Sequence, residues 1–447
     1  MTDHIATDVV IGGGGIAGST AAIALSKAGV QVMLVEPTLR SDKRYGGEIL
    51  HPKGLANLAE LGLNLSALGA DIDGFHVWED QAGDVKLPYA ASAQGPGLAI
   101  QHARLHAALF AEASQCSNVT VVRGMKVIGM VDHPNCIDVM VAGKCGRMSV
   151  RARLLVGADG SRSQIRKLAG FVCRRESLSM VSMATVPSSA LPDSDCAHLF
   201  VDGERIAFAY PIDGMRARVM VDHASGTAPS PQEIIDLLPA ACPTSIRKAL
   251  CNQREDQGLR RFLTSLVSVD HACCGHTVLV GDASGTCHPL TASGMTAATS
   301  DALSLAKAIA EMPDDLGIAA TSHAARRKSR QLTRLALATL LHEIYTDSTP
   351  RSTALRRAMM SDWGSVAGQV HGISLLSMTE DRPHQLLRSM TRILYRGLAH
   401  LHTPAAPLGL AGEFLAGVRA SKTVFRYGTA LLTNSYRLLG GNGRDTA

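Results

Sequence analysis

The sequence predicts an α/β protein with an inserted antiparallel β-sheet and a helical C-terminal region. A strand, a turn, a helix and a second strand follow one another between Thr7 and Pro37. Short strands separated by turn residues fill 178–270, and nearly everything after Thr296 has helical periodicity. With 447 residues, 46% of them apolar, the chain is long enough for two domains, or for one large α/β domain with an inserted sheet.

The first element is a Rossmann-like βαβ unit with a glycine-rich turn. We expect Gly13 to make the tight turn, Gly15 to admit a pyrophosphate, and Gly18 to let helix and strand pack closely. Glu36 ends the second strand about twenty residues on, where an acid binds ribose hydroxyls in dinucleotide sites. The alternative is a glycine-rich turn with a structural role only, which this strand–turn–helix context disfavours.

A second signal lies far along the chain, in residues 281–295. Asp282 stands at a strand end, where it would accept a hydrogen bond from a ribityl hydroxyl. Gly294 lets the start of the helix predicted over Thr296–Ala310 approach an anionic cofactor. Together with the βαβ unit, this turn predicts one FAD lying along its site.

A third strand-to-helix turn covers residues 157–163, after a strand at Leu154–Val156. Asp159, with Arg166 and Lys167 one turn into the helix, would face a flavin or nicotinamide phosphate. The equally weighted alternative is a surface turn with a solvated charge cluster. Upstream of this turn the pattern predicts a helix over 105–114 and strands over 119–122, 127–131 and 137–141.

Residues 178–270 predict an antiparallel sheet domain that roofs the flavin ring, with strands over 199–201, 206–210 and 218–221. The predicted domains are therefore an FAD-binding part over 1–177 with a small sheet insertion, a substrate domain over 178–270, completion of the FAD-binding domain over 271–346, and a C-terminal helical region over 347–447.

The C-terminal region contains the longest helical pattern, Ala324–Tyr345, and two basic amphipathic segments. Residues 384–399 place apolar residues on one side and Arg388, Arg392 and Arg396 on another. A mixed segment follows over 414–439. These segments either dock on a membrane surface to collect a lipophilic substrate or pack on the core as ordinary helices, and the second reading is favoured.

Composition excludes several classes of protein. The net charge of +5 and the lack of a basic run interleaved with aromatic residues argue against a nucleic-acid partner. Ten cysteines form no CxxC pair, and His342-Glu343 lacks the second histidine of a HExxH motif, so no metal site is predicted. No apolar stretch reaches about 20 residues, the length of a spanning helix. A reduced cytoplasm, with or without peripheral contact to the cytoplasmic membrane, fits best.

Read together, these motifs resemble the squalene epoxidase (squalene monooxygenase) branch of the class A flavoprotein monooxygenases, which share the p-hydroxybenzoate hydroxylase type of fold. Residues 44–54 read RYGGEILHPKG, similar to the family's R-x-x-G-E-x-L-Q-P-G-G. Residues 102–105 read HARL, similar to H-G-R-F, and residues 288–296 read HPLTASGMT, similar to H-P-L-T-G-G-G-M-T.

The resemblance implies which residues hold FAD. These are the backbone near Ile16, Ala17 and Lys126, and the side chains of Glu36, Arg44, Ile49, Arg104, Asp282 and Met295. It also implies that Tyr89 lies near the flavin and contacts the residue at the family's glutamine position, which is His51 in this chain. Tyr89 and His51 are therefore the candidate catalytic residues, and His51 favours a substrate other than squalene itself.

The implied activity is insertion of one oxygen atom from O2 into a lipophilic alkene or aromatic substrate, through a flavin C4a-hydroperoxide. Electrons would come from NAD(P)H, directly or through a partner reductase. Phenol hydroxylation would benefit from a base such as His51, whereas epoxidation needs none. Two alternatives remain: an FAD-dependent reductase of polyprenyl or alkene groups, and a non-catalytic flavin-fold protein that binds prenylated partners.

Overall fold

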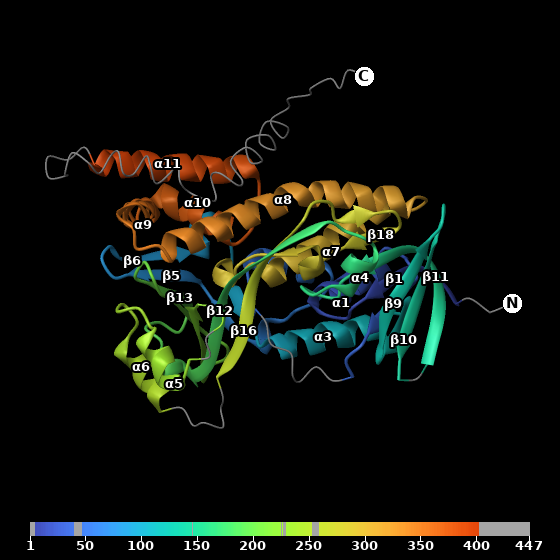
Figure 1. The fold of residues 1–447 in the computed structure, drawn as a ribbon, viewed down its shortest axis with the longest axis horizontal. Helices are drawn as coiled ribbons and strands as arrows, with labels where there is room; N and C mark the ends of the chain where they lie inside the picture. Colours follow the sequence, from blue (N-terminus) through green and yellow to red (C-terminus); the bar gives the residue numbers. More distant parts are fainter. Residues whose placement is uncertain are drawn as a thin grey trace, which may run out of the picture.

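The computed structural model describes residues 5–39, 47–144, 146–224, 226, 229–252 and 259–401. In these residues the strands form two large sheets and one small sheet. In Figure 1 the two large sheets lie toward opposite ends of the molecule, and the helices α7 (Gly294–Glu311) and α8 (Leu316–Tyr345) extend between them. The predicted mixed α/β class with a helical C-terminal region is confirmed.

The first sheet contains the predicted βαβ unit. The strand β1 (Ile5–Gly12) pairs in parallel with β2 (Val32–Glu36) and with β11 (Gly146–Gly157), and α1 (Ile16–Lys27) connects the first two. Val9, Val10 and Ile11 are completely buried, as expected for a strand covered on both faces. The sheet is completed by β8 (Val119–Arg123), β9 (Met125–Asp132), β10 (Ile137–Gly143), β17 (Cys273–Cys274) and β18 (Thr277–Leu279).

The second sheet has the strand order β19-β16-β12-β15-β14-β13-β5-β6. The three predicted strands correspond to β13 (Cys196–Val201), β14 (Ile206–Pro211) and β15 (Arg216–His223). Two long strands without clean alternation, β12 (Cys173–Pro187) and β16 (Arg260–Val269), were not predicted. The other strands are β5 (Gly74–Glu79), β6 (Gly83–Pro88) and β19 (Gly285–Thr286).

This sheet draws on more of the chain than 178–270. β13 pairs in parallel with β5, so the hairpin β5–β6 from the first 177 residues extends the sheet at one edge. The boundary expected after residue 177 falls inside β12. Residues on both sides of that boundary belong to one strand of the second sheet, because β12 pairs with β16 from Cys173 and with β15 up to Pro187.

A small sheet and five shorter helices complete the described part of the fold that precedes α7. The small sheet has the order β3-β7-β4, formed by β3 (Ile49–Leu50), β7 (Gly97–Ala99) and β4 (Ala70–Ile72). The shorter helices are α2 (Pro52–Glu60), α3 (His102–Gln115), α4 (Gln164–Leu168), α5 (Pro231–Asp236) and α6 (Thr244–Cys251). α1 packs against α3 and α7, which fixes the glycine turn between them.

The C-terminal helices α9 (Pro350–Trp363), α10 (Val366–Leu376) and α11 (Pro383–Leu401) pack beside α8 (Figure 1). α11 buries Leu386, and the guanidinium groups of Arg392 and Arg396 lie 2.7 and 3.0 Å from the buried Asp362 carboxylate. The apolar side of this amphipathic helix therefore faces protein. No helix in the described residues is long and apolar enough to cross a membrane, and the segment 414–439 lies outside them.

Candidate active site

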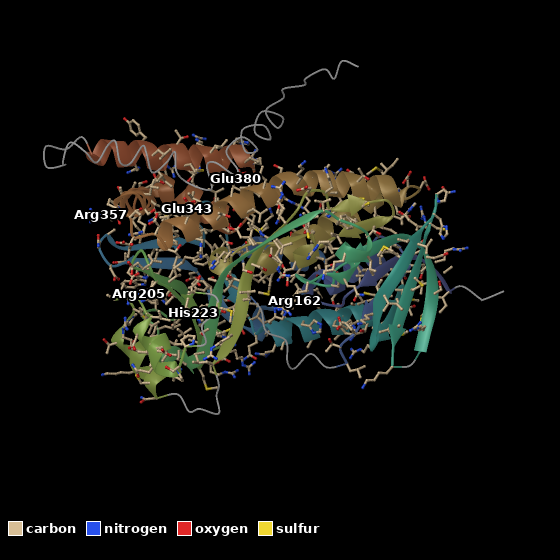
Figure 2. All side chains as sticks on the ribbon, in the orientation of Figure 1. Arg162, Arg205, His223, Glu343, Arg357 and Glu380 are labelled. Carbon is tan, nitrogen blue, oxygen red and sulfur yellow. The ribbon has the colours of Figure 1, made fainter. Side chains whose placement is uncertain are left out.

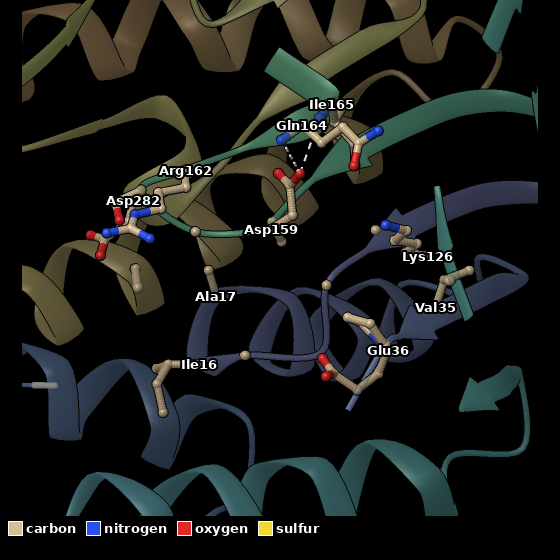
Figure 3. Close-up of a pocket in the computed structure, with 18 of the residues that line it drawn as sticks. Ile16, Ala17, Val35, Glu36, Lys126, Asp159, Arg162, Gln164, Ile165 and Asp282 are labelled. Carbon is tan, nitrogen blue, oxygen red and sulfur yellow. Dashed lines mark hydrogen bonds between the residues drawn. The ribbon is translucent and has the colours of Figure 1, made fainter. Parts of the chain in front are cut away.

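A cleft of about 520 Å³ lies where the βαβ unit meets the turn at 281–295 (Figure 3). Its size is typical of small-molecule and cofactor sites. Ten of the predicted site residues line it: Gly13, Gly15, Ile16, Ala17, Glu36, Lys126, Asp159, Asp282, Gly294 and Met295. The structure thus brings together two motifs that are far apart in the sequence.

The glycine turn is shaped by close backbone contacts. Gly13 has φ +106°, and a Cβ there would lie 2.5 Å from the carbonyl oxygen of Ala158. A Cβ on Gly18 would lie 1.8 Å from the carbonyl oxygen of Gly13. Gly18 does not line the cleft, so its role here is to permit packing between helix and strand.

Glu36 supports the same turn from β2. Its buried carboxylate accepts hydrogen bonds from the backbone N–H groups of Gly14, at 2.7 Å, and Thr38, at 2.8 Å. The side chain still lines the cleft, where Figure 3 shows it near the start of α1. A fixed carboxylate at this point suits the hydroxyl groups of a ribose.

Two helices begin at the cleft. α1 starts at Ile16 after Gly15, which has no side chain to cap the helix. α7 starts at Gly294 after Ser293, whose side chain makes no hydrogen bond to the helix backbone. The first N–H groups of each helix and the positive end of its dipole are therefore available to an anion. This donor set fits the pyrophosphate of a dinucleotide.

Asp282 lies in the turn at the other end of the cleft. The surrounding protein raises the pKa of its carboxyl group, while the charges of Arg334 and His102 act in the opposite direction. The turn is held by Asp301, which accepts a hydrogen bond from the Gly281 N–H at 3.1 Å and pairs with Arg327 at 2.7 Å. Asp282 therefore faces the cleft from a turn that Asp301 and Arg327 hold in place.

The third predicted turn needs a correction. The Asp159 carboxylate accepts hydrogen bonds from the N–H groups of Gln164, at 2.7 Å, and Ile165, at 3.0 Å, so it caps α4 (Figure 3). Arg166 donates to the carbonyl oxygens of Ala283 and Ser161, at 2.8 and 2.9 Å, and does not face a phosphate. Lys167 is exposed and does not line the cleft.

The basic group that the prediction missed in this turn is Arg162, which lines the cleft before α4 begins. The same charge cluster could have identified it, but the helix start was unknown. A second missed residue is His102, whose Nδ1 lies 3.2 Å from the Gly47 carbonyl oxygen.

Two residues implied by the resemblance, Ile49 and Arg104, lie away from the cleft. Ile49 is buried in the apolar core beside the second sheet and does not line the cleft. Arg104 is exposed and also lies away from the cleft wall, which His102 reaches instead. Arg44 lies outside the described residues. Arg104 is the third residue of α3 and lies on the exposed side of its first turn.

His51 and Tyr89 form a buried pair. His51 Nδ1 lies 2.7 Å from the Tyr89 Oη, and Nε2 lies 2.9 Å from the Thr291 carbonyl oxygen. Because a carbonyl oxygen only accepts, Nε2 carries the proton and Nδ1 accepts from the tyrosine hydroxyl. Burial lowers the pKa of His51 to about 4 and raises the pKa of Tyr89. Both side chains are therefore neutral at neutral pH, and neither lines the cleft.

The residues present fit FAD. The cleft offers two uncapped helix starts for a pyrophosphate, carboxylates at both ends for hydroxyl groups, and a backbone cradle at Gly13 that a Cβ would fill. Apolar side chains such as Ile16 and Met295 add walls suited to a flat ring system.

Comparisons with known proteins agree with this cleft. A family model described as FAD binding domain matches residues 6–335. The chain is 26% identical over 400 residues to squalene monooxygenase of Mus musculus, covering 85% of this chain and 69% of that protein. It is 35% identical over 175 residues to 6-methylpretetramide 4-monooxygenase of Streptomyces rimosus, covering 38% of this chain and 42% of that protein.

Among solved structures, the chain is similar to p-nitrophenol 4-monooxygenase from Pseudomonas putida DLL-E4. The TM-score is 0.72 and the sequence identity 20%, with 86% of this chain and 99% of that chain covered. At this identity the likeness concerns the fold.

Proposed function

The chain belongs to the squalene epoxidase-like, class A group of FAD-dependent monooxygenases, and we propose that its substrate is a lipophilic compound carrying an alkene or an aromatic ring. The enzyme uses FAD, O2 and a small-molecule substrate, and NAD(P)H is the electron source typical of the family. When bound, FAD supplies the oxygen-activating chemistry. The alternative of a non-catalytic binding protein is set aside, because the relatives are enzymes.

The observation that carries the cofactor assignment is the shared cleft of the βαβ unit and the 281–295 turn. Glu36 binds ribose hydroxyls, Asp282 binds a ribityl hydroxyl, and the starts of α1 and α7 bind the pyrophosphate. Lys126 and Arg162 add positive charge to the cleft. The protein's further contribution is to orient the substrate and to exclude water.

The names of the relatives support the proposed substrate class. The curated relatives include squalene monooxygenase and 6-methylpretetramide 4-monooxygenase, whose names give squalene and 6-methylpretetramide as their substrates. The buried, neutral His51–Tyr89 pair is a weak base, because burial lowers the pKa of His51 to about 4 and raises that of Tyr89. We assign this pair a positioning role beside the loop at 291, in place of the catalytic role expected from the sequence.

Two partners remain proposals. A separate reductase would deliver electrons to the flavin if NAD(P)H does not do so directly. Contact with a membrane surface would involve the basic segment 414–439 more than α11, since Arg392 and Arg396 are engaged by Asp362.

The division of the chain into FAD-binding, substrate and C-terminal parts also stays a prediction.

Oxygen uptake coupled to product formation tests the function. The purified holoprotein is supplied with NADPH or NADH and a panel of squalene, prenylated quinones and polycyclic phenols under ¹⁸O₂. One labelled oxygen atom in a product is the expected result. A saturated product without label would contradict it and support the alkene reductase on the same scaffold.

A further inference from the structure

A second, much smaller cavity of about 20 Å³ lies between the second sheet and the 281–295 turn. Its walls include the apolar side chains of Val181, Phe208, Met220 and Leu290, and its polar residues are Asp222 and His288. The turn thus serves two spaces, since Asp282, Gly294 and Met295 line the cofactor cleft. A cavity of this size has room for one hydroxyl group or one water molecule, so it accepts the tip of a ligand.

The two polar residues of the cavity belong to a cluster of three side chains from three elements, of which His342 lies outside the cavity wall. Asp222 comes from β15, His288 from the turn before α7, and His342 from α8. The carboxylate Oδ2 of Asp222 lies 2.8 Å from His288 Nε2 and 4.0 Å from His342 Nε2. Figure 2 labels His223 and Glu343, the chain neighbours of Asp222 and His342.

The Asp222 Oδ2 lies 2.8 Å from His288 Nε2 and keeps the capacity to accept a further hydrogen bond. It is buried and has no hydrogen-bond partner of good geometry in the described part of the chain. His288 is close enough, but its Nε2 also lies 3.3 Å from the Ser179 hydroxyl, which can accept the imidazole proton. A buried, unpaired carboxylate oxygen costs stability unless a ligand or water donates to it.

The protonation of His288 argues against a metal ion at this cluster. Its Nδ1 accepts a hydrogen bond from the Leu290 N–H at 3.3 Å, so the proton of the neutral ring is on Nε2. A histidine that binds a metal through Nε2 normally donates from Nδ1 to an oxygen. Here Nδ1 faces a donor, so the cluster is arranged to receive a hydrogen-bond donor and not a cation.

We propose that Asp222 and His288 form the site that binds, and takes the proton from, a hydroxyl group on an aromatic or enolic substrate. This inference rests on the proposed monooxygenase function and narrows its substrate class. The substrate O–H bond breaks, the proton passes to Asp222 Oδ2, and the electron pair stays on the substrate oxygen. The ring thereby gains the electron density that attack on an electrophilic oxygen requires.

His342 gives the proton a way out. Its side chain is 21% exposed, whereas that of Asp222 is 9% exposed, so it lies between the buried carboxylate and the surface. The other groups near the cluster are Ser179, which contacts His288, and Thr264, which bonds Ser179 at 2.7 Å. His223 points elsewhere on the sheet, toward Ser182. Asp222 and His288 touch the substrate, and His342 acts through Asp222.

Binding of chromogenic phenols tests the proposal without turnover. The oxidised holoprotein is titrated with 4-nitrophenol and 4-nitro-1-naphthol at a pH where the free phenols are mostly protonated. The wild type should bind them with growth of the phenolate absorbance band. Asp222→Asn should bind without that band, and Asp213→Asn, at an exposed turn of the same sheet, should behave like the wild type.

Turnover separates this inference from the function on which it rests. With a phenolic substrate, Asp222→Asn should lower kcat/KM by about 100-fold or more, a larger loss than with a hydrocarbon alkene. Equal loss with both substrates, an undiminished phenolate band, or failure of the wild type to bind either phenol would overturn the inference. Stoichiometric zinc that Asp222→Asn removes would also overturn it. Absence of ¹⁸O in every product would instead overturn the monooxygenase function.

A second variant covers the case in which Asp222→Asn does not fold. His342→Gln should lower kcat for the phenol with little change in KM, and added imidazole should restore it. A lowered kcat without rescue by imidazole would contradict the proton outlet.

Discussion

Tyr89 Oη donates a 2.7 Å hydrogen bond to His51 Nδ1, and both side chains are buried beside the loop that precedes α7. The opposite nitrogen of His51 donates to the Thr291 carbonyl oxygen. His51 therefore joins the 3-10 turn at Tyr89 to the turn at 281–295. It does so as a neutral bridge, because burial holds its pKa at about 4.

This bridge predicts acid sensitivity. In the unfolded chain His51 takes up a proton near its ordinary pKa of about 6.5, and in the folded protein only near 4. Between these values the unfolded state binds more protons, so stability falls as the pH decreases from about 6.5 to about 4, by about 3 kcal/mol in total. Below that range the His51 contribution stays constant.

The variant His51→Gln should remove this pH dependence and keep the bridge, since an amide can accept from Tyr89 and donate to Thr291. Urea unfolding at about pH 7 and about pH 5 measures it. The exposed His271→Gln is the control. An unchanged acid slope in His51→Gln would show that His51 is not held neutral. His323, also buried with its pKa lowered to about 4, adds a slope that both variants retain.

A second prediction concerns the buried pair of Glu48 and Arg218, which ties the segment before β3 to the second sheet. The guanidinium donates two hydrogen bonds of 2.7 Å to the carboxylate, and the Tyr210 hydroxyl adds a third at 3.1 Å. Arg218→Ala should cost about 3–5 kcal/mol because it leaves a buried charge unpaired. The double variant Glu48→Gln, Arg218→Met should cost less than Arg218→Ala alone.

Urea unfolding of Glu48→Gln, of Arg218→Met and of the double variant measures the coupling free energy between the two residues. The surface pair Arg216 and Asp213, with side chains 52% and 22% exposed, supplies a comparison cycle, with an expected coupling below about 1 kcal/mol. Additive changes in the free energy of unfolding would show that Glu48 and Arg218 do not stabilise each other.

The elements that the sequence predicted well are those with local signals. The βαβ unit and the two helices expected over Thr296–Ala310 and Ala324–Tyr345 follow from glycine positions and apolar periodicity over neighbouring residues. Both helices begin earlier than expected, at Gly294 and Leu316. The hairpin β5–β6 was not expected in the second sheet, because its pairing with β13 joins distant segments. Such pairing depends on tertiary contacts that no local pattern encodes.

The site shows the same limit at the level of single side chains. The charge cluster at 157–167 was found from the sequence, but the start of α4 decides which arginine faces the cleft. Arg162, before the helix, does so, whereas Arg166 is turned toward carbonyl oxygens. His51 was expected to serve as a base, and its burial, which lowers its pKa to about 4, could not be read from the sequence. Asp222 carried no sequence signal beyond alternation in a strand.

A third prediction concerns FAD affinity. Glu36→Ala should weaken FAD binding by about 10- to 100-fold, since a hydrogen bond to a charged group contributes about 1.5–3 kcal/mol. Ultrafiltration of the protein with FAD fluorescence as the readout measures the dissociation constant. Glu60→Ala, on the exposed side of α2, is the matched control. Unaltered affinity in Glu36→Ala would remove Glu36 from the site.

A fourth prediction concerns membranes. Truncation before α11 would remove Leu386 and expose the core residues against which it packs, so substitution is the better test. In the full chain, changing Arg419, Lys422, Arg426 and Arg437 to Gln should reduce flotation with anionic liposomes, because each basic group near the surface contributes about 1 kcal/mol. The control changes Lys144, Arg147, Arg216 and Arg326, all exposed elsewhere. Equal flotation of the two variants would contradict a C-terminal membrane contact.

The FAD content of Asp282→Ala tests the central claim most directly, namely that the βαβ unit and the 281–295 turn hold one FAD between them. Flavin absorbance per protein is measured after gel filtration, with circular dichroism and thermal unfolding as checks of folding. Asp270→Ala, at an exposed position, is the control. We predict that Asp282→Ala folds but has lost its flavin. Full flavin occupancy in that variant would show that the 281–295 turn does not hold FAD.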